Sequence, residues 1–357
     1  MSGDEREYVD RLVAPDALAS YLEGRLGPAD AIDVERHEAG HSNETLFVEW
    51  GSRDLVLRRP PPGETAESAH DVLREYRVQE ALQGTPVPVP RTVLACEDES
   101  VIGSEFYLME REAGDVVREA EPERFATPDH RRRIGEALVD TLATVHGVDV
   151  EAVGLGEFGY PEGFTERQVD RWSGQYEWAF EVTAAEREVP AVHELTGWLR
   201  EHVPETHPHT LVHGDYTLNN VMFGPGGPPE LVAVFDWELS TLGDPFTDLG
   251  WLLMAWADEG DRLADLGSLA PPALTAREGY PTRRELVERY EAATGRRFEN
   301  DRFYRVLAFY KLGALGEMFY RRHLEGNADD EIYPEMVDTV PAIAERALRI
   351  ADGTETL

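Results

Sequence analysis

Apolar and polar residues alternate with two different periods along this chain. In the first third, the segments 32–38, 45–50 and 55–57 have a strand-like pattern of apolar and polar residues and are separated by turns that contain glycine. Farther along, apolar residues recur every three or four positions, most clearly over 131–146, as on one face of a helix. This change of period predicts a small β-rich part followed by a larger helical part.

The β-rich part contains helical periods as well as strands. Its further elements are two predicted helices and two predicted strands, at 8–26, 68–83, 92–95 and 105–110 respectively. Gly84 follows the second helix, and glycine favours the backbone conformation that ends helices. The predicted order is a helix followed by a small antiparallel sheet with one inserted helix.

The larger part is predicted to be mainly helical. Beyond 131–146, helices are predicted at 165–180, 192–203, 246–258, 282–293, 301–323 and 331–350. Two short strands interrupt them, one before His213 and one at 231–235. We therefore expect an α+β fold of two lobes, a β-rich lobe over 1–111 and a helical lobe over 112–357.

Charge narrows the classes of partner. The chain has 70 acidic and 34 basic residues, a formal net charge of −36, and Lys311 is its one lysine. Such a surface repels nucleic acid and anionic membranes, so we expect neither as a partner. Dispersed acidic residues with almost no lysine resemble the proteins of salt-loving microbes, which indicates a halophilic protein.

Cysteine content and hydropathy indicate the compartment. The single cysteine, Cys96, excludes an internal disulfide and a cysteine-based zinc site, and it lies in an apolar segment typical of a strand. The acidic N-terminal residues contain no apolar stretch of the kind that signal peptides have. No segment approaches the roughly 20 apolar residues of a membrane span. We expect a cytoplasmic protein.

Two short motifs carry the candidate chemistry. The first runs His213-Gly-Asp-Tyr-Thr-Leu-Asn-Asn, and the second is Phe235-Asp-Trp, each after an apolar strand. Asp215, Asn220 and Asp236 are therefore expected on loops that leave adjacent strands. Phosphoryl transfer from a magnesium nucleotide needs one carboxylate for the acceptor hydroxyl and oxygen ligands for the metal. The alternative is a pair of tight turns capped by Asp and Asn, but the joint spacing favours a kinase-type site.

These motifs carry a resemblance to a known family. Together with Gly243-Asp-Pro-Phe-Thr-Asp-Leu-Gly-Trp and Leu57-Arg-Arg-Pro-Pro-Pro-Gly, they resemble the aminoglycoside phosphotransferase and choline kinase family. More narrowly, they are similar to the phosphotransferase domains fused to acyl-CoA dehydrogenases and to the stand-alone bacterial relatives of those domains. The resemblance covers roughly residues 30 to 335. It implies a protein-kinase-like fold.

The resemblance implies a role for each residue of the two motifs. Asp215 would be the catalytic carboxylate, which orients the acceptor hydroxyl and takes its proton. Asn220 and Asp236 would hold the Mg²⁺ that bridges the nucleotide phosphates. We interpret His213 as a packed, hydrogen-bonded residue that shapes the loop.

Two further aspartates are interpreted as structural supports. Asp244 precedes Pro245, an order typical of a helix N-cap followed by proline in the first turn. Asp248 would lie in that first turn, where a negative charge suits the helix dipole. In the family the corresponding aspartate braces the catalytic loop.

The N-terminal lobe would bind the nucleotide. The turn with Gly40, Ser42 and Asn43 lies between two predicted strands, where backbone N–H groups could cradle phosphates. Protein kinases use a strand lysine paired with a helix glutamate to hold the phosphates. In this chain the matching pair is Arg58 and Glu75, and an arginine can also bind phosphate through two donors.

The connection between the two lobes would bind the base. The segment 106–111 leads from the last strand of the predicted sheet toward the helical lobe. An adenine is expected to hydrogen-bond to backbone groups near Glu110 and Arg111. The alternative is that this segment is only an edge strand with no role in binding the base.

The expected function is transfer of the γ-phosphate of ATP, or of GTP, to a hydroxyl group of a small molecule. The alternatives are a catalytically silent kinase-like binding or regulatory module and a metal-dependent hydrolase, which would need more ligands. Family members act on aminoglycosides, choline, homoserine, sugars and hydroxyacyl groups, and the narrower resemblance favours a small or acyl-type acceptor. The acceptor site is expected in the helical lobe, near Trp172 to Trp178, with as further candidates Tyr304, Tyr310, Glu317, Phe319 and Arg321.

Overall fold

The computed structural model describes residues 3–37, 43–62, 71–205, 209–327 and 330–357. The chain forms two compact units. The first contains Met1–Gly114 and the returning segment Val232–Ser240, and the second contains Asp115–Leu231 and Thr241–Leu357. The division into contiguous lobes 1–111 and 112–357 remains a prediction. The two units differ from it in that the segment Val232–Ser240 belongs to the first unit.

The first unit is built on an antiparallel sheet. Its five strands are β1 (Ile32–Arg36), β2 (Glu44–Trp50), β3 (Arg53–Arg59), β4 (Thr92–Cys96) and β5 (Phe106–Glu110). They lie in the order β1-β2-β3-β5-β4, and every neighbouring pair is antiparallel. The predicted small antiparallel sheet is therefore confirmed.

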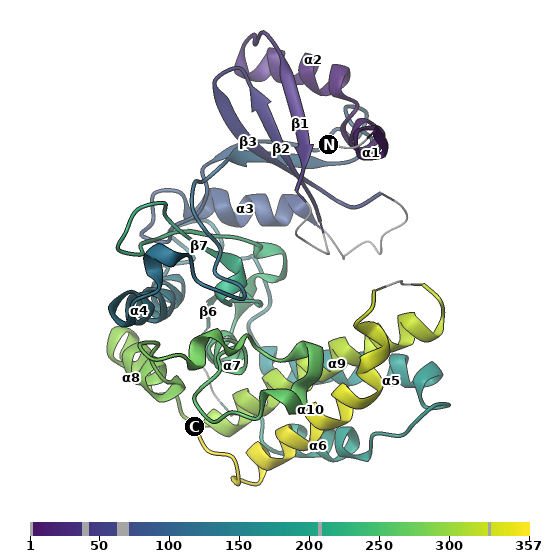
Figure 1. The fold of residues 1–357 in the computed structure, drawn as a ribbon, viewed down its shortest axis with the longest axis vertical. Coiled ribbons are helices and arrows are strands. Elements are labelled where there is room, and N and C mark those ends of the chain that lie inside the picture. The colour runs from purple at the N-terminus through teal and green to yellow at the C-terminus, as the bar shows by residue number, and fades with distance from the viewer. Residues whose placement is uncertain (1–2, 38–42, 63–70, 206–208, 328–329) are drawn as a thin grey trace. The chain divides into compact units, whose positions relative to one another are not determined.

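Helices cover both faces of this sheet (Figure 1). Residues of α1 (Gly3–Val13) and α2 (Pro15–Leu26) pack in one apolar cluster with Leu55 and Leu57 of β3, whereas Val56 packs with α3 (Val72–Leu82). This alternation along β3 follows from the two-residue period of a strand.

The predicted single helix at 8–26 is wrong in one respect, because the structure has two helices there. The backbone of Ala14 has a φ of 42°, outside the helical region, and Pro15 follows as the first residue of α2. Proline is tolerated in the first turn of a helix but disrupts a helix interior, so one helix ends before Pro15 and a second helix begins there. Leu12, Val13, Leu18 and Leu22 are nevertheless all buried, as the apolar pattern predicts.

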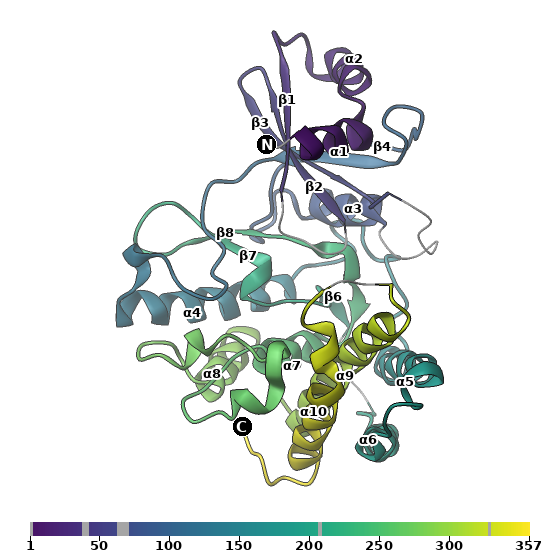
Figure 2. The same ribbon diagram turned by 45° about the vertical axis from the view of Figure 1, so that its right-hand side comes forward.

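The second unit is mainly helical. Its helices are α4 (Pro128–Val145), α5 (Phe164–Thr183), α6 (Pro190–Glu201), α7 (Pro245–Met254), α8 (Arg283–Thr294), α9 (Asp301–Leu324) and α10 (Met336–Ala351). Helices α9 and α10 lie side by side in both views (Figures 1 and 2). Among the described helices none combines the length and the apolar composition that crossing a membrane requires.

Short strands and 3-10 turns surround the two sequence motifs. The strands are β6 (Thr210–Val212), β7 (Val221–Phe223), β8 (Leu231–Val234) and β9 (Thr241–Gly243), and the turns next to the motifs are η2 (Leu218–Asn220) and η3 (Trp237–Leu239). The prediction of two strands, β6 and β8, as neighbours is therefore wrong, because β6 pairs with β9. Strands of three or four residues are too short for a periodic pattern to reveal how they pair.

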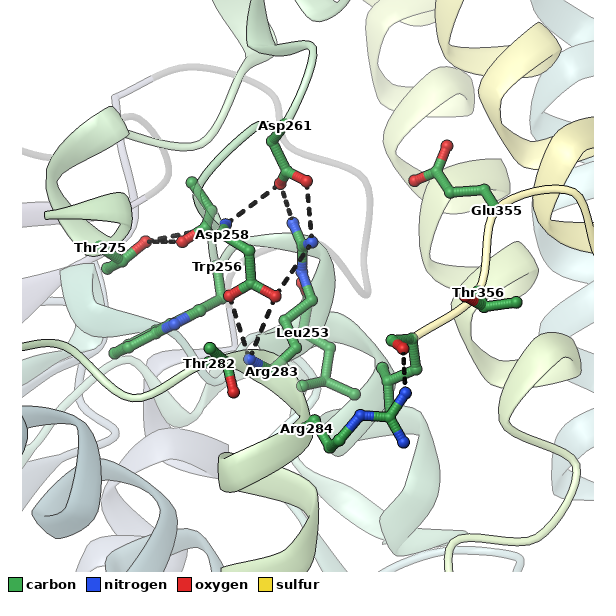
Figure 3. A network of polar contacts seen from close by, with 12 residues as sticks. Leu253, Trp256, Asp258, Asp261, Thr275, Thr282, Arg283, Arg284, Glu355 and Thr356 are labelled. Atoms are coloured by element: carbon green, nitrogen blue, oxygen red, sulfur yellow. Dashed lines mark hydrogen bonds and ion pairs between the residues drawn. The ribbon is translucent and has the colours of Figure 1, made fainter. Parts of the chain in front are cut away.

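A charged network joins the end of α7 to the start of α8 (Figure 3). The Arg283 guanidinium donates to the Leu253 carbonyl at 2.8 Å and pairs with Asp261 through two nitrogens. The backbone N–H of Arg283 donates to Asp258 at 3.1 Å. A positive side chain at a helix N-terminus is unfavourable by itself, so these two carboxylates stabilise the arrangement.

Candidate functional site

The loop that carries Asp215 is fixed by backbone hydrogen bonds. It begins after β6 at His213 and turns at Gly214, whose φ of 85° is readily adopted by glycine alone. The carboxylate of Asp248 accepts the N–H groups of His213, at 2.6 Å, and of Gly214, at 2.8 Å. The His213 ring is fully buried, and its Nδ1 accepts the N–H of Asp215 at 3.2 Å. His213 is thus a packed residue that shapes the loop, as predicted.

Asp248 is a charged support beneath this loop. Its Oδ2 also lies 3.2 Å from the Nε2 of His146. Burial by itself would raise the pKa of Asp248, but the contacts with His146 and His213 outweigh it and hold the pKa below its ordinary value. The carboxylate therefore stays negative and keeps both backbone bonds. This confirms the predicted bracing role.

Asp244 is the predicted N-cap of α7. Its side chain accepts the N–H of Phe246 at 3.0 Å and the hydroxyl of Tyr304 at 2.6 Å. Burial raises the pKa of Asp244 to about 6, although both hydrogen bonds oppose this rise. The prediction of an N-cap followed by proline is confirmed.

The Asp215 carboxylate is held at both oxygens. The indole N–H of Trp251 donates to Oδ1 at 2.7 Å, and the amide of Asn220 donates to Oδ2 at 2.9 Å. The same amide donates to the Asp215 backbone carbonyl at 2.8 Å. Since each carboxylate oxygen can accept more than one hydrogen bond, this half-buried group can still receive a hydroxyl proton.

Trp251 and Lys311 adjoin Asp215 although neither was among the predicted site residues. Trp251 comes from α7, and Lys311 comes from α9 and donates to the carbonyl of Gly214 at 2.7 Å. Trp251 belongs to the motif that carries the resemblance, and Lys311 is the one lysine of the chain. Those two signals were available, but spacing along the sequence does not connect helices so far apart.

Arg58 is the centre of an ion cluster within the first unit. Its guanidinium lies 3.3 Å from Glu75, donates to the Thr45 hydroxyl at 2.7 Å and lies 3.4 Å from Asp236. Burial lowers the pKa of Arg58, but the charges of Glu75 and other neighbours more than offset this, so the side chain stays protonated. The proposed pairing of Arg58 with Glu75 is thus seen as a contact, while the binding of phosphate by this pair stays a prediction.

Asp236 has an unusual backbone. Its φ of 64° lies in the left-handed region, which Asp and Asn tolerate better than other side chains. The side chain is 31% exposed and touches Arg58 with one oxygen. The carboxylate therefore keeps oxygen atoms that can reach a ligand.

One residue of the predicted phosphate turn is described. Asn43 is buried, and its amide donates to Glu238 at 3.1 Å. Its side-chain carbonyl oxygen accepts no hydrogen bond within the described part of the chain, so it is available to accept one from a ligand or from water. Gly40 and Ser42 lie outside the described residues.

The predicted adenine contacts have their backbone donors already engaged. The N–H of Glu110 donates to the Arg91 carbonyl at 2.8 Å, and the N–H of Arg111 donates to the Asp54 carbonyl at 3.0 Å. The Arg111 guanidinium also lies over the Phe47 ring, 3.6 Å from its centroid. An adenine at this edge would therefore bind other backbone groups than these two donors.

The oxygen donors of each motif are of the chemical kind that suits a hard cation. Within the described ranges, no group of three or more His, Cys, Asp and Glu side chains could hold a metal by itself. The Asn220 amide nitrogen is engaged by Asp215, which leaves the amide oxygen as the atom suited to a metal. Asp236 likewise retains exposed carboxylate oxygen. Carboxylate and amide oxygens are ligands that Mg²⁺ accepts together with phosphate and water.

The other candidates from the helical part are mostly structural. Tyr304 hydrogen-bonds to Asp244, and Tyr310 bonds to Thr196 at 2.6 Å. Glu317 is fully buried and pairs with Arg187 at 2.8 Å. These three side chains stabilise helix packing. Phe319 stacks on Tyr333 and Arg321 lies over Trp178, contacts that give no sign of a bound substrate.

Comparison with known proteins extends the picture. A model of the phosphotransferase enzyme family matches residues 33–303. The acyl-CoA dehydrogenase family member 11 of Rattus norvegicus is 35% identical over 327 residues, which make up 90% of this chain and 41% of that protein. The chain thus spans less than half the length of this relative.

Solved structures show the same fold. A protein from Ralstonia eutropha, provisionally assigned as an aminoglycoside phosphotransferase, is 32% identical with a TM-score of 0.81, over 95% of this chain and 98% of that chain. A complex of an aminoglycoside 2″-phosphotransferase with GDP and kanamycin is 14% identical, with a TM-score of 0.62 over 92% and 98% of the two chains. Choline kinase from Cryptosporidium parvum is 9% identical, with a TM-score of 0.63 over 95% of each chain. The last two show the fold alone.

These neighbours confirm the α+β, protein-kinase-like fold that the motifs predict. The family model covers most of the chain, and the Ralstonia eutropha protein is similar over nearly its whole length. The chain therefore belongs to the phosphotransferase enzyme family.

Proposed function

We propose that this protein transfers the γ-phosphate of a magnesium nucleotide, ATP in the first place and GTP as the other donor, to a hydroxyl group of a small molecule. The observation that carries the proposal is the Asp215 carboxylate, held by Trp251 and Asn220 and still half-exposed. A carboxylate fixed in this way can orient a hydroxyl for in-line attack without reorganising during the reaction.

The roles of the other residues follow from their chemistry. Asp215 accepts the proton of the attacking hydroxyl. Asn220 and Asp236 hold Mg²⁺, which when bound neutralises charge on the phosphates. Arg58, kept in place by Glu75, supplies a fixed positive charge for a phosphate oxygen.

The remaining predicted contacts position the nucleotide. Backbone groups of the turn at Gly40, Ser42 and Asn43 bind phosphate. The buried side-chain oxygen of Asn43 supports a ligand there, because it has no hydrogen-bond donor among the residues that the structure describes. Backbone near Glu110 and Arg111 binds the base, by groups other than the two N–H donors engaged in the sheet. The aminoglycoside phosphotransferase with bound GDP supports a nucleotide as the co-substrate.

The setting of the reaction is proposed from charge and from the relatives. The net charge of −36 argues against nucleic acid and membrane partners, and we place the protein in the cytoplasm of a salt-adapted cell. The relation to acyl-CoA dehydrogenase family member 11 favours a hydroxyl on an acyl group as the acceptor. That relative is much longer, so its dehydrogenase activity is not carried over.

Nucleotide binding in high salt tests the proposal. Thermal unfolding is measured with ATP and with GTP, each with and without Mg²⁺, for the wild type, Asp236→Ala and the exposed control Asp33→Ala. We expect magnesium-dependent stabilisation in the wild type and in the control variant, and its loss in Asp236→Ala, because ligands that bind the native state raise its stability.

Three outcomes separate the alternatives. No magnesium-dependent stabilisation in the wild type would contradict the kinase function. Stabilisation without ADP release on any hydroxylated metabolite, including 3- and 4-hydroxyacyl-CoAs, would favour a catalytically silent binding or regulatory module. Nucleotide-independent release of product from such compounds would favour a metal-dependent hydrolase.

A further inference from the structure

Lys311 is the one side chain of this protein that ends in an ammonium group. The other 33 basic residues among its 34 are arginines. Lys311 lies in the middle of α9, and its Nζ donates to the carbonyl of Gly214, the residue that precedes Asp215. A compact, strongly hydrated point charge differs from the planar fork of a guanidinium, so a lysine at this position has distinct binding properties.

The ammonium group lies against two indole rings. Its Nζ is 3.8 Å from the ring centroid of Trp251 and 5.6 Å from that of Trp172. Both rings are buried, and the faces of indole rings attract cations. A pair of tryptophans beside a catalytic carboxylate would therefore suit a cationic ligand, but here a side chain of the protein itself supplies the cation.

The ammonium group also keeps donors for a ligand. Of its three N–H bonds, one points to Gly214, and the part of the chain that the structure describes offers it no second hydrogen-bond acceptor. The residue is only half-buried by its accessible surface. The pKa of Lys311 lies below its ordinary value because burial lowers it, and the negative charges of Asp215 and Asp248 offset only part of that shift.

We propose that Lys311 selects the acceptor: it binds an oxygen of a carbonyl or carboxylate group next to the reacting hydroxyl and excludes acceptors that carry an ammonium group there. This inference rests on the proposed function and adds to it the class of substrate. A second ammonium would meet like charge, and Lys311 already occupies the indole face that could attract it. An oxygen-rich acceptor instead gains a charge-assisted hydrogen bond.

The single lysine makes the proposal directly observable. Protein labelled with ¹³C at the lysine ε carbon gives one lysine signal, assigned to Lys311 by its loss in Lys311→Met. With Mg-ADP present, we expect 3-hydroxybutyrate and its neutral amide to shift this signal at millimolar concentration. The amine analogue 4-amino-2-butanol should leave the signal unchanged. A shift with the amine, or none with the carboxylate, would overturn the proposal.

Turnover provides the second measurement. We expect kcat/KM at least about tenfold higher for acceptors with a carbonyl or carboxylate than for matched ammonium analogues. Lys311→Met should reduce this ratio about tenfold, and Lys311→Arg should restore part of it because the charge returns. If Lys311 served only to brace Gly214, both kinds of acceptor would lose activity by the same factor and the ratio would not move.

The two proposals fail in different ways. The NMR measurement needs no catalysis, so it decides the role of Lys311 even for a silent module. Absence of magnesium-dependent nucleotide binding would contradict the kinase function and leave the Lys311 signal free to report on acceptors. An effect of Lys311→Met confined to the KM of the nucleotide would contradict selection of the acceptor while leaving phosphoryl transfer intact.

Discussion

At the scale of single residues, the site depends on how side chains are held as much as on which are present. Asp215 owes its orientation to an indole from α7 and to the amide of Asn220, and its loop is fixed by Asp248 from the same helix. The helix that begins at Asp244 therefore contributes both a donor to the carboxylate and an acceptor to the loop. Such supporting contacts are what keep catalytic groups in a productive geometry.

The first prediction concerns the role of Asp215. Asp215→Asn keeps the size of the side chain and an oxygen for Trp251, but it cannot accept a proton. We expect kcat to fall by about 10²- to 10⁴-fold, the usual contribution of a general base, while Mg-nucleotide stabilisation is retained. Trp251→Phe, which removes one donor and keeps the carboxylate, should cost less. A kcat within twofold of the wild type in Asp215→Asn would exclude this base.

The second prediction concerns the pH dependence of stability. Because the folded pKa of Asp244 is about 6, above its ordinary value, the native state binds the proton more tightly than the unfolded chain does. This contribution to stability is present at low pH and is lost as pH rises through about 6. Relative to Asp244→Asn, the wild type should lose roughly 1 kcal/mol of unfolding free energy between pH 5 and pH 7. Urea unfolding of both proteins at both pH values measures this loss. A wild type that gains unfolding free energy relative to Asp244→Asn between pH 5 and pH 7 would contradict the prediction.

At the scale of elements, the apolar period predicted most of the fold because most elements bury one face. It predicted the helix at α4 and the strands of the first unit, where Leu55 and Leu57 face one way and Val56 the other. It missed the break at Ala14, since apolar residues continue on both sides of the break and only the following proline marks it.

The sequence predicted those residues of the candidate site that lie close together along the chain. Asp215 and Asn220 lie five residues apart, and the structure brings their side chains into contact. Trp251 and Lys311 reach the same carboxylate and loop from α7 and α9, so only tertiary packing reveals them. The pairing of β6 with β9 could not be predicted from the sequence either, because strands of three residues are too short to show which strand they pair with.

The third prediction tests the packing of α7 against α9. A Cβ added at Gly250 of α7 would lie 2.7 Å from the carbonyl oxygen of Tyr304, which belongs to the backbone and cannot rotate away. Gly250→Ala should therefore cost about 1–3 kcal/mol of unfolding free energy. Gly174→Ala in α5 is the matched control: among the described residues nothing lies within 4 Å of its added Cβ, so it should gain roughly 0.5–1 kcal/mol. Equal effects of the two substitutions would contradict this account.

At the scale of the whole molecule, the excess of acidic residues dominates long-range electrostatics. With 70 acidic and 34 basic residues, repulsion among carboxylates outweighs attraction between opposite charges when averaged over the surface. Local pairs such as Arg283 with Asp261 are short and partly buried, so salt screens them less than it screens the surface.

The fourth prediction follows from that balance. The unfolding temperature should rise by several degrees as KCl increases from about 0.1 M to about 1 M, because the screening length falls from about 10 Å to about 3 Å. Differential scanning calorimetry at pH 7 measures the shift, with an uncharged osmolyte at equal osmolality as the control. An unfolding temperature that falls with KCl, or a gain matched by the osmolyte, would argue against repulsion as the cause and against salt adaptation.

The return of residues Val232–Ser240 to the first unit has a consequence for building chimeric proteins from this family. Residues 115–231 of the second unit separate the segment that carries Asp236 from the rest of the first unit. The first unit is therefore not a contiguous stretch of the gene. A single crossover near residue 114 would exchange Arg58 and Glu75 but leave their partner Asp236 from the other parent. Exchanging the complete first unit between two relatives therefore requires three junctions, after residues 114, 231 and 240.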